Sequence, residues 1–377
     1  MQEKRHLNII SFDIPYPPDY GGVIDVFYKL KALADRDIKL HCHFFQYKDR
    51  KKSKELYNIC NEVFYYKRNR MKNPFSNGYP YIVKTRQSAE LLKNLNNNNY
   101  PILFEGLHTC FYINHKSLSN RKKIVRMHNI EHLYYSYLAK NETNILKKAF
   151  FTKEAKKLKE YLNILTFANK IAAISTNDSS YLHIKFPDKT FYLPVFHPND
   201  NININLKKGD FALYNGNLSV NENIKAALFL INEVFYKINY KLIIAGKNPP
   251  KKLYNATKNK TNIEIISNPD NKTLQKLFDD AHIHILPTFQ NTGIKLKLLN
   301  ALFNGKFVIV NPPMIENTDL KDICIVAQNA EEMRKLILFY KNKIPNKAYI
   351  ELRKQTLQKK YSTDRSAKIL IRNFFDD

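Results

Sequence analysis

Short apolar runs alternate with segments of helical length through most of the 377-residue chain. The runs are rich in β-branched and aromatic residues and lack a strict polar–apolar alternation, as strands buried on both faces of a parallel sheet do. The strands predicted in the first half are Leu7–Phe12, Leu40–Gln46, Val63–Tyr66, Pro101–Glu105, Lys123–His128, Lys170–Ser175 and Thr190–Pro194.

Segments of helical length lie between these strands. Gly22–Ala34 and Gln87–Leu95 are predicted as single helices, and Ile130–Phe167 is long enough for two. Strands and helices that alternate at this spacing form βαβ units, whose strands pair in parallel. The first half is therefore predicted to be a doubly wound α/β domain.

A polar segment, Phe196–Gly209, interrupts the pattern and has a composition typical of a linker. The alternation then restarts. Strands are predicted at Phe211–Gly216, Lys241–Gly246, Ile263–Ser267, His282–Pro287, Phe307–Val310 and Ile323–Ala327, and helices at Asn221–Phe235, Asn271–Asp280, Gly293–Phe303 and Asp364–Phe375. The restart predicts a second sheet of the same kind. We expect one domain over 1–198, a second over 199–360, and a C-terminal helix within 361–377 that packs back toward the first domain.

The cysteines and the apolar segments exclude several classes of protein. Cys42, Cys60, Cys110 and Cys324 have no CxxC spacing, so neither a disulfide framework nor a zinc site is expected. No metal or other cofactor is predicted. The N-terminus lacks the apolar core of a signal peptide, and no stretch approaches the roughly 18 apolar residues of a membrane span. A cytoplasmic protein is expected.

The net charge is +27, and residues 51–160 hold 22 of the 61 basic but only 8 of the 34 acidic residues. This excess favours an anionic partner, such as a phospholipid surface, a phosphorylated substrate or nucleic acid. Solvated faces of a chain rich in Lys and Asn would give the same count. Charge alone leaves both interpretations open.

The loops that follow strands are where doubly wound sheets bind ligands. The first loop, Asp13–Gly22, ends in a glycine pair, which would let backbone N–H groups approach an anion or simply cap an ordinary turn. Lys295 and Lys297 lie near the start of the helix predicted from Gly293. Cations are unfavourable there unless an anion is bound, so they indicate either a phosphate site or a solvated lysine pair.

Four motifs carry a resemblance that covers nearly the whole chain. They are PYPPDYGG near the start, RMHNIEHLYY (Arg126–Tyr135), YNGNLSVNEN (Tyr214–Asn223) and, most specifically, NTGIKLKLLNALFNGKFVIV (Asn291–Val310). The chain resembles the retaining GT-B glycosyltransferases of the "group 1" family, which use nucleotide-sugar donors. The resemblance implies two Rossmann-like domains that face each other across a cleft.

The resemblance also implies roles for individual residues. In the first domain, Gly21 and Gly22 match the loop that meets the donor diphosphate and the acceptor, and His128 matches a histidine near the transferred sugar. We add Asp19 as a residue that could orient the acceptor. In the second domain, the matched residues are Gly216 and Asn217 on the turn after the first strand, Ser267 beside the base, Thr292, Gly293, Ile294 and Lys295 over the sugar and phosphates, and Asn300 at the ribose.

The motifs depart from the family pattern at charged positions. The family often has two glutamates eight residues apart, where this chain has Thr292 and Asn300, and an arginine where it has Asn217. Lys295, Lys297 or Lys225 would then neutralise the diphosphate. His128, Lys295 and Asp19 are the predicted catalytic residues. No paired carboxylates are evident, so the diphosphate oxygen is expected to accept the acceptor's proton.

The resemblance favours transfer of a sugar to a growing glycan or a lipid-diphosphate-linked acceptor, in the synthesis of a cell-surface polysaccharide or lipopolysaccharide. A nucleotide-sugar epimerase and an inactive sugar-nucleotide-binding homologue are the alternatives. A nucleic-acid binder is disfavoured because no RRM, KH or zinc-finger signature is present. The basic, aromatic segment Lys67–Phe75 could dock peripherally on an anionic membrane.

Overall fold

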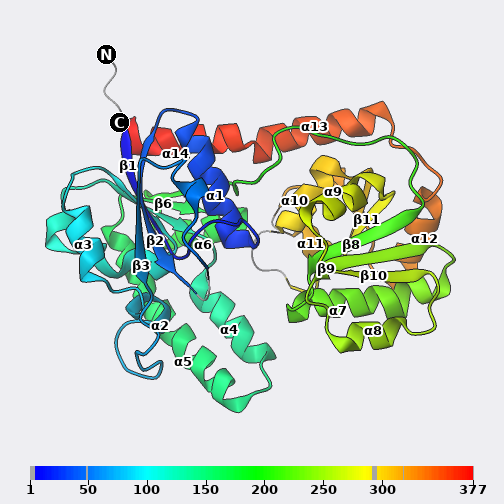
Figure 1. The fold of residues 1–377 in the computed structure, drawn as a ribbon, viewed down its shortest axis with the longest axis horizontal. Helices are drawn as coiled ribbons and strands as arrows, with labels where there is room; N and C mark the ends of the chain where they lie inside the picture. The colour runs from blue at the N-terminus through cyan, green and yellow to red at the C-terminus, as the bar shows by residue number, and fades with distance from the viewer. Residues whose placement is uncertain (1–4, 48–49, 291–294, 317, 377) are drawn as a thin grey trace. The chain divides into compact units, whose positions relative to one another are not determined.

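The computed structural model describes residues 5–47, 50–290, 295–316 and 318–376 (Figure 1). The chain forms two compact units. The described residues up to Pro198 and from Tyr361 onward form one, which we call the N-terminal unit. The described residues of 199–290 and 295–360 form the other, the C-terminal unit.

The N-terminal unit is built on a seven-stranded parallel sheet with the order β3-β2-β1-β4-β5-β6-β7. Its strands are β1 (His6–Ser11), β2 (Lys39–Gln46), β3 (Glu62–Lys67), β4 (Ile102–Glu105), β5 (Lys123–Met127), β6 (Lys170–Ala173) and β7 (Thr190–Tyr192). Its helices are α1 (Gly21–Ala34), α2 (Tyr81–Lys84), α3 (Ala89–Leu95), α4 (Glu131–Asn141), α5 (Ile145–Tyr161), α6 (Thr176–Lys185) and α14 (Thr363–Phe375).

The C-terminal unit repeats this plan with a six-stranded parallel sheet in the order β10-β9-β8-β11-β12-β13. Its strands are β8 (Phe211–Asn217), β9 (Lys241–Lys247), β10 (Ile263–Ser267), β11 (Ile283–Leu286), β12 (Phe307–Val310) and β13 (Ile325–Val326). Its helices are α7 (Asn221–Phe229), α8 (Lys251–Thr257), α9 (Asn271–Asp280), α10 (Leu296–Asn304), α11 (Pro312–Ile315) and α12 (Ala330–Tyr340), and α13 (Lys347–Tyr361) leads on to α14.

Both strand orders reverse direction next to the first strand of the sheet. In the N-terminal unit the reversal lies between β1 and β4, and in the C-terminal unit between β8 and β11. Loops that leave two such strands diverge to opposite faces, which opens a crevice where doubly wound sheets bind ligands. The predicted α/β class with two doubly wound sheets is confirmed.

All thirteen predicted strands are present, with ends within two residues of the prediction. Two helix predictions were wrong in extent. The α-helix predicted over Asn221–Phe235 ends at Phe229 and gives way to a π-helical turn, Leu230–Val234. The helix predicted from Gly293 begins at Leu296, because the backbone of Lys295 (φ −92°, ψ 72°) is not helical.

The C-terminal helix α14 belongs to the core of the N-terminal unit. Its residues Ala367, Leu370 and Phe374 are buried in the cluster that also holds Leu30 and Leu33 of α1. Figure 1 shows α14 beside α1. Burial of large apolar side chains contributes roughly 1.5–3 kcal/mol each, so α14 is an integral part of this unit.

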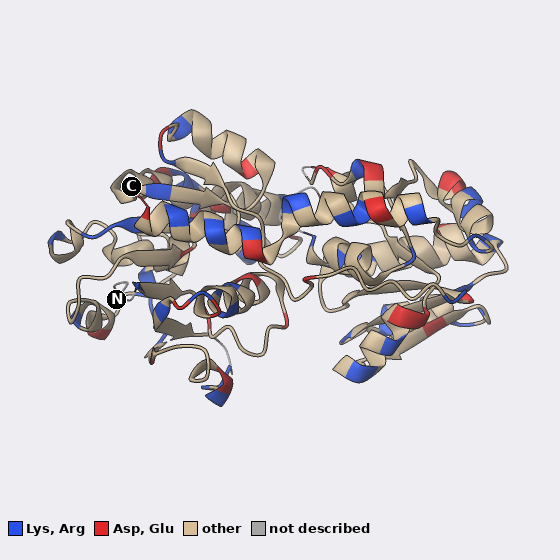
Figure 2. Cartoon of the chain, turned by 90° about the horizontal axis from the view of Figure 1, so that it is seen from above, with Lys and Arg blue, Asp and Glu red and all other residues tan. Residues whose placement is uncertain are grey.

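Basic residues are spread over helices and loops of both units rather than gathered on one element (Figure 2). Among the described helices, none has the length and hydrophobicity that crossing a membrane requires.

Candidate functional site

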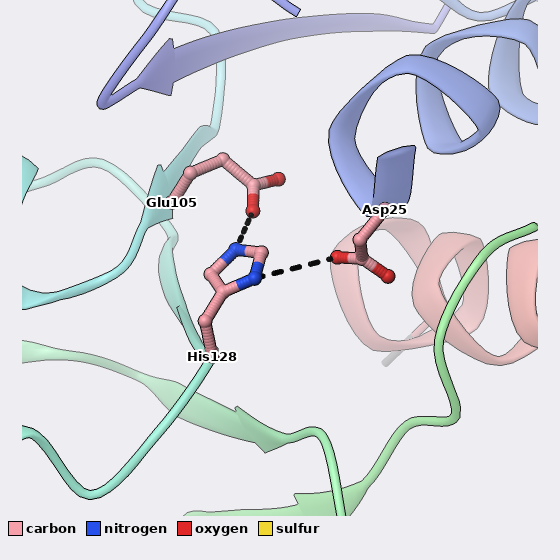
Figure 3. Close-up of side chains that lie close together, drawn as sticks. All are labelled: Asp25, Glu105 and His128. Atoms are coloured by element: carbon pink, nitrogen blue, oxygen red, sulfur yellow. Dashed lines mark hydrogen bonds and ion pairs between the residues drawn. The ribbon is translucent and has the colours of Figure 1, made fainter. Parts of the chain in front are cut away.

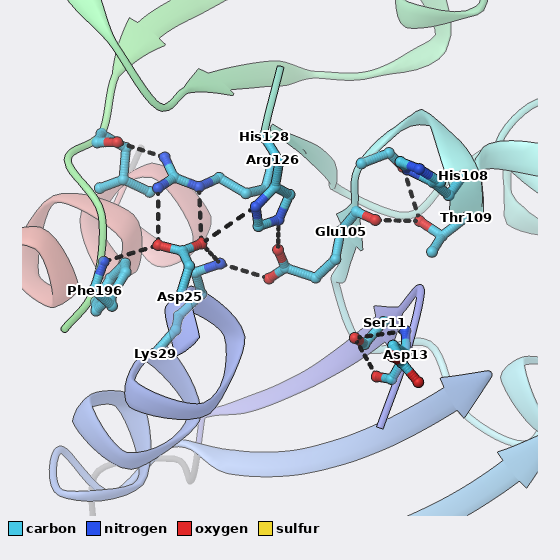
Figure 4. Close-up of polar contacts among 12 residues, drawn as sticks. Ser11, Asp13, Asp25, Lys29, Glu105, His108, Thr109, Arg126, His128 and Phe196 are labelled. Atoms are coloured by element: carbon cyan, nitrogen blue, oxygen red, sulfur yellow. Dashed lines mark hydrogen bonds and ion pairs between the residues drawn. The ribbon is translucent and has the colours of Figure 1, made fainter. Parts of the chain in front are cut away.

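Five charged or titratable side chains meet at the centre of the N-terminal unit. We call them the buried ion cluster: Asp25, Lys29, Glu105, Arg126 and His128 (Figure 4). They come from the first helix, α1, from the ends of β4 and β5, and from the loop after β5. Each side chain is at least about nine-tenths buried, so the charges must balance one another.

Lys29 bridges the two carboxylates of the cluster. Its Nζ lies 2.9 Å from Oδ2 of Asp25 and 2.7 Å from Oε1 of Glu105. Arg126 also pairs with Asp25, with Nη2 3.0 Å from Oδ1. Two cations therefore neutralise two carboxylates in the absence of any charge on His128.

Backbone groups complete the coordination of Asp25 and Arg126. The N–H of Phe196 donates to Oδ1 of Asp25 at 2.8 Å, and Arg126 donates to the carbonyl oxygens of Leu193 and Pro194. The cluster thus ties the chain that follows β7 to α1 and β5 (Figure 4).

His128 lies between the two carboxylates (Figure 3). Its Nε2 donates to Oε2 of Glu105 at 2.8 Å, and its Nδ1 lies 3.9 Å from Oδ2 of Asp25. The ring is buried and packs edge-on against Phe12, with centroids 5.2 Å apart. In this predicted site residue, Nε2 is therefore engaged in a hydrogen bond within the N-terminal unit.

The cations of the cluster keep both carboxylates ionised. Burial alone would raise the pKa of Asp25, but Arg126 and Lys29 outweigh it and hold that pKa far below its usual value. Burial likewise opposes ionisation of Glu105, yet Lys29 and the hydrogen bond from His128 lower its pKa. The two carboxylates are therefore ion-paired with Lys29 and Arg126, and are not a free acid–base pair.

Asp25, Glu105 and His128 are close enough together to be considered as ligands of a metal ion. The ammonium group of Lys29 already contacts both carboxylates, however, and supplies the positive charge that an ion would bring. The donor set as it stands fits an ion-pair cluster, and a cation could enter only by displacing Lys29.

Phe12 follows β1 and lies beneath the predicted glycine loop. A Cβ added to Gly22 would come 2.7 Å from Cζ of Phe12, so an alanine at position 22 would force this half-buried ring to move. Gly21 begins α1, whose first turn holds no acidic side chain. An N-terminus without an acidic side chain is compatible with anion binding, and the packing against Phe12 is compatible with an ordinary turn, so both interpretations of this loop stay open.

Asp19 lies in the same loop and pairs with Arg50, whose Nη1 is 2.7 Å from Oδ1 of Asp19. Arg50 also donates through Nε to the carbonyl oxygen of Ile14 at 2.8 Å. Asp19, the predicted acceptor-orienting residue, is therefore paired with Arg50, and Arg50 also hydrogen-bonds the loop in which Asp19 lies.

Glu131, in the HNIE motif, is a second buried carboxyl group at the strand ends. Burial raises its pKa to about 8, against opposing effects of Arg86 and Asn129. Its Oε1 lies 4.0 Å from Nδ1 of His108, an atom that is buried without a hydrogen-bond partner. Burial first, and then Arg86, hold the pKa of His108 well below its usual value, so both side chains are neutral at pH 7.

In the C-terminal unit, Glu222 and Lys297 lie near the reversal between β8 and β11. Glu222, in the first turn of α7, accepts hydrogen bonds from the backbone N–H of Phe289 at 2.6 Å and from Oγ1 of Thr288 at 3.2 Å. Lys297 packs over the ring of Tyr214 and donates to Oδ1 of Asn223 at 3.0 Å.

The two lysines of the donor motif lie at the start of α10. Lys295 precedes α10 and Lys297 lies in its first turn. The pKa of each ammonium group is lowered to about 8, mainly by burial and, for Lys297, also by the charge of Lys295, while Glu222 acts in the opposite direction on both. Burial of two ammonium groups at the start of α10 favours an anionic ligand there.

The other predicted residues of this unit occupy strand ends or α10. Gly216 and Asn217 end β8, and Ser267 ends β10. Asn300 is half-buried, and its Oδ1 accepts from Nδ2 of Asn304 at 3.0 Å. Thr292, Gly293 and Ile294 lie outside the described residues.

Comparison with known proteins places these two units in a known architecture. Residues 210–339 match the family model described as "Glycosyl transferases group 1". A Klebsiella pneumoniae protein, described as an uncharacterized 44.6 kDa protein in the cps region, is 28% identical over 327 residues, which are 80% of this chain and 81% of that protein.

Solved structures share the fold at low sequence identity. TarM superposes with a TM-score of 0.72 at 12% identity, over 100% of this chain and 99% of that chain. Sucrose-phosphate synthase from Thermosynechococcus elongatus gives 0.69 at 13% identity, over 97% of each chain. A glycosyltransferase from Rickettsia africae gives 0.66 at 12%, over 99% and 100%.

The architecture is therefore GT-B, with two doubly wound parallel-sheet domains. The segment 210–339, which matches the group 1 glycosyltransferase model, contains Glu222, Lys295 and Lys297. The chain is a glycosyltransferase.

Proposed function

We propose that the chain transfers a sugar from a nucleotide-sugar donor to a glycan or lipid-linked acceptor, with retention at the anomeric carbon, in the synthesis of a cell-surface polysaccharide. The observation that carries the proposal is the lysine pair Lys295 and Lys297 at the start of α10, within the segment that matches the family model. Ammonium groups whose pKa is lowered by burial gain most from an anion such as a diphosphate.

Two relatives support the choice of donor and product. The cps region named for the Klebsiella pneumoniae protein points to a capsular polysaccharide. A variant of TarM from S. aureus has been solved in complex with UDP and α-GlcNAc-glycerol, and it shares the fold of this chain with a TM-score of 0.67 at 12% identity. We therefore propose a nucleoside diphosphate sugar as donor and a hydroxyl group as acceptor.

In this reaction the bond between the anomeric carbon and the diphosphate oxygen breaks while the acceptor oxygen bonds to the same carbon. Negative charge grows on the leaving diphosphate, where Lys295 and Lys297 stabilise it. For retention, the acceptor attacks from the face of the leaving group, and a diphosphate oxygen takes the acceptor's proton. The N-terminal unit, with Gly21 at the start of α1, would bind the acceptor.

A thermal-shift screen against UDP-, GDP- and ADP-sugars tests this function, because a ligand that binds the folded state raises its stability. We expect one nucleotide class to raise the melting temperature. Proton NMR of the transfer product then reports the anomeric configuration. A sugar that is converted while still attached to its nucleotide would instead show an epimerase.

We also propose that the N-terminal unit docks on an anionic membrane. Met71, in the loop formed by the basic segment Lys67–Phe75, is 95% exposed. Ile145 and Leu146 at the start of α5 are 81% and 75% exposed. Phe75 of that loop contacts Phe150 of α5, which joins the loop and the helix into one surface. Exposed apolar side chains beside lysines are typical of peripheral membrane binding.

Sedimentation with anionic and zwitterionic vesicles tests this docking. The double substitution Ile145→Ser with Leu146→Ser should reduce binding to anionic vesicles. Ile184→Ser is the matched control, because Ile184 is equally exposed (84%) but lies on α6. Equal sedimentation with both lipids would contradict the proposal.

A further inference from the structure

Glu222 joins the loops that leave the two strands at the reversal of the C-terminal sheet. β8 and β11 are neighbours in that sheet, and the chain continues from β8 to α7 and from β11 to Thr288 and Phe289. The carboxylate of Glu222 accepts from the N–H of Phe289 at 2.6 Å and from the hydroxyl of Thr288 at 3.2 Å. These bonds close the loop after β11 against the first turn of α7.

The loop after β11 is fixed from a second strand as well. Asn311, which follows β12, accepts from the N–H of Thr288 at 2.9 Å and donates to its carbonyl oxygen at 2.6 Å. Thr288 is buried. Glu222 and Asn311 thus hydrogen-bond the loop at Thr288 and Phe289, just before the donor motif.

Glu222 also acts on the charges of the lysine pair. Lys295, Lys297 and Tyr214 are the titratable groups that interact with its carboxylate, and Lys225 of the same helix lies over the ring of Phe289. Burial lowers the pKa of both lysines, and Glu222 counteracts this. The charge of a diphosphate would act in the same direction as Glu222 and offset the burial of both ammonium groups.

We propose that Glu222 is the positioning residue of the donor site: its carboxylate holds the loop at Thr288 and Phe289 in place, and its charge lies on the first turn of α7, where Asn223 accepts from Lys297. It would supply from α7 an acidic group that the donor motif itself lacks at Thr292 and Asn300. This inference rests on the proposed function and adds a residue from a different helix to that site.

Substitution of Glu222 separates its two roles. Glu222→Gln keeps an oxygen that accepts from Phe289 but removes the charge, whereas Glu222→Ala removes both. The dissociation constant of the nucleotide sugar that stabilises the wild type is measured from pH 6 to 9.5, together with the melting temperature. Glu233→Gln, at an exposed position after α7, is the control.

We expect Glu222→Gln to have a melting temperature close to that of the wild type and a similar affinity for the nucleotide sugar at pH 6.5. As the pH rises, its affinity should begin to fall at a lower pH than that of the wild type. The sign follows because without the carboxylate the lysine pKa values fall further. Glu222→Ala should lose about tenfold in affinity at every pH, as expected for a lost hydrogen bond to a charged group. Glu233→Gln should match the wild type.

Two results would overturn the inference and are distinguishable. If the wild type binds a nucleotide sugar and Glu222→Gln has the same pH profile, Glu222 has at most a structural role. If the wild type binds none of the three nucleotide classes, the proposed function fails, and the inference fails with it.

Discussion

Nε2 of His128 donates a hydrogen bond of 2.8 Å to Oε2 of Glu105, and both side chains are buried. The histidine of the HNIE motif is therefore part of a charge network that joins α1, β4 and β5. Both ring nitrogens lie toward carboxylates of this network, and the ring packs nearly perpendicular to that of Phe12. We expect His128 to depend on Glu105 for its orientation.

Glu105→Gln should destabilise the N-terminal unit. Loss of this carboxylate leaves Lys29 buried with Asp25 alone, which already pairs with Arg126. Removal of one partner from a buried ion pair costs about 3–5 kcal/mol in the free energy of unfolding. Urea denaturation followed by circular dichroism measures this cost.

An exposed carboxylate provides the control for Glu105. Glu331 pairs with Lys335 on α12, and both side chains are largely exposed. Exposed pairs of this kind contribute about 0–1 kcal/mol, so Glu331→Gln should leave the unfolding free energy almost unchanged. Equal effects of the two substitutions would show that the buried ion cluster does not stabilise the unit.

Glu131 should make stability depend on pH. Its folded pKa of about 8 lies above its usual 4.5, so the carboxyl group stabilises the folded state fully below pH 4.5. This contribution declines as the pH rises, by about 1.4 kcal/mol for each unit, and is lost above pH 8. Glu131→Gln stays neutral, so it should gain stability relative to the wild type between pH 5 and pH 8.

Urea denaturation of both proteins at pH 5, 6.5 and 8 measures this difference. Parallel stabilities of Glu131→Gln and the wild type across the three pH values would show that Glu131 is ionised in the folded protein.

Donor affinity should fall as the pH rises above about 8. Lys295 and Lys297 have lowered pKa values of about 8 in the free protein, and a bound diphosphate would raise them. Binding is therefore tightest below pH 8, and above it the protein must take up protons to bind. Calorimetry in buffers of different ionisation enthalpy detects the uptake, and a binding heat independent of buffer at pH 8.5 would contradict it.

Gly22→Ala tests why a glycine begins α1. The added Cβ would lie 2.7 Å from Cζ of Phe12, and overpacking of this kind costs about 1–3 kcal/mol, which exceeds the roughly 0.5–1 kcal/mol that alanine gains within a helix. We expect a lower melting temperature. An increase would mean that Phe12 moves freely and that Gly22 is not required for packing.

The strands, the parallel sheets and the restart after Phe196–Gly209 could be predicted from sequence because each is a local pattern. The runs Leu7–Phe12 and Phe307–Val310, for example, are apolar on both faces and carry their own signal. Lys295 and Lys297 could be found for the same reason, since two cations near a helix start conflict with the helix dipole within one segment.

The buried ion cluster could not be found in this way. Asp25 and Glu105 are 80 positions apart in the sequence, and only the pairing of β1 with β4 brings α1 next to Glu105. Lys29, four residues after Asp25, reads as an ordinary pair on a helix surface. Glu222 was hidden likewise, because its partners Thr288 and Phe289 meet it only across the reversal between β8 and β11.

The central claim is that the lysines beside α10 bind the diphosphate of a nucleotide-sugar donor. Isothermal titration at pH 7 of the donor that stabilises the wild type tests it most directly, with Lys297→Ala and the exposed control Lys276→Ala on α9. We predict that Lys297→Ala weakens binding at least about tenfold, as for a lost charged hydrogen bond, while Lys276→Ala binds like the wild type. Equal affinity of Lys297→Ala and the wild type, with the fold intact, would contradict the account.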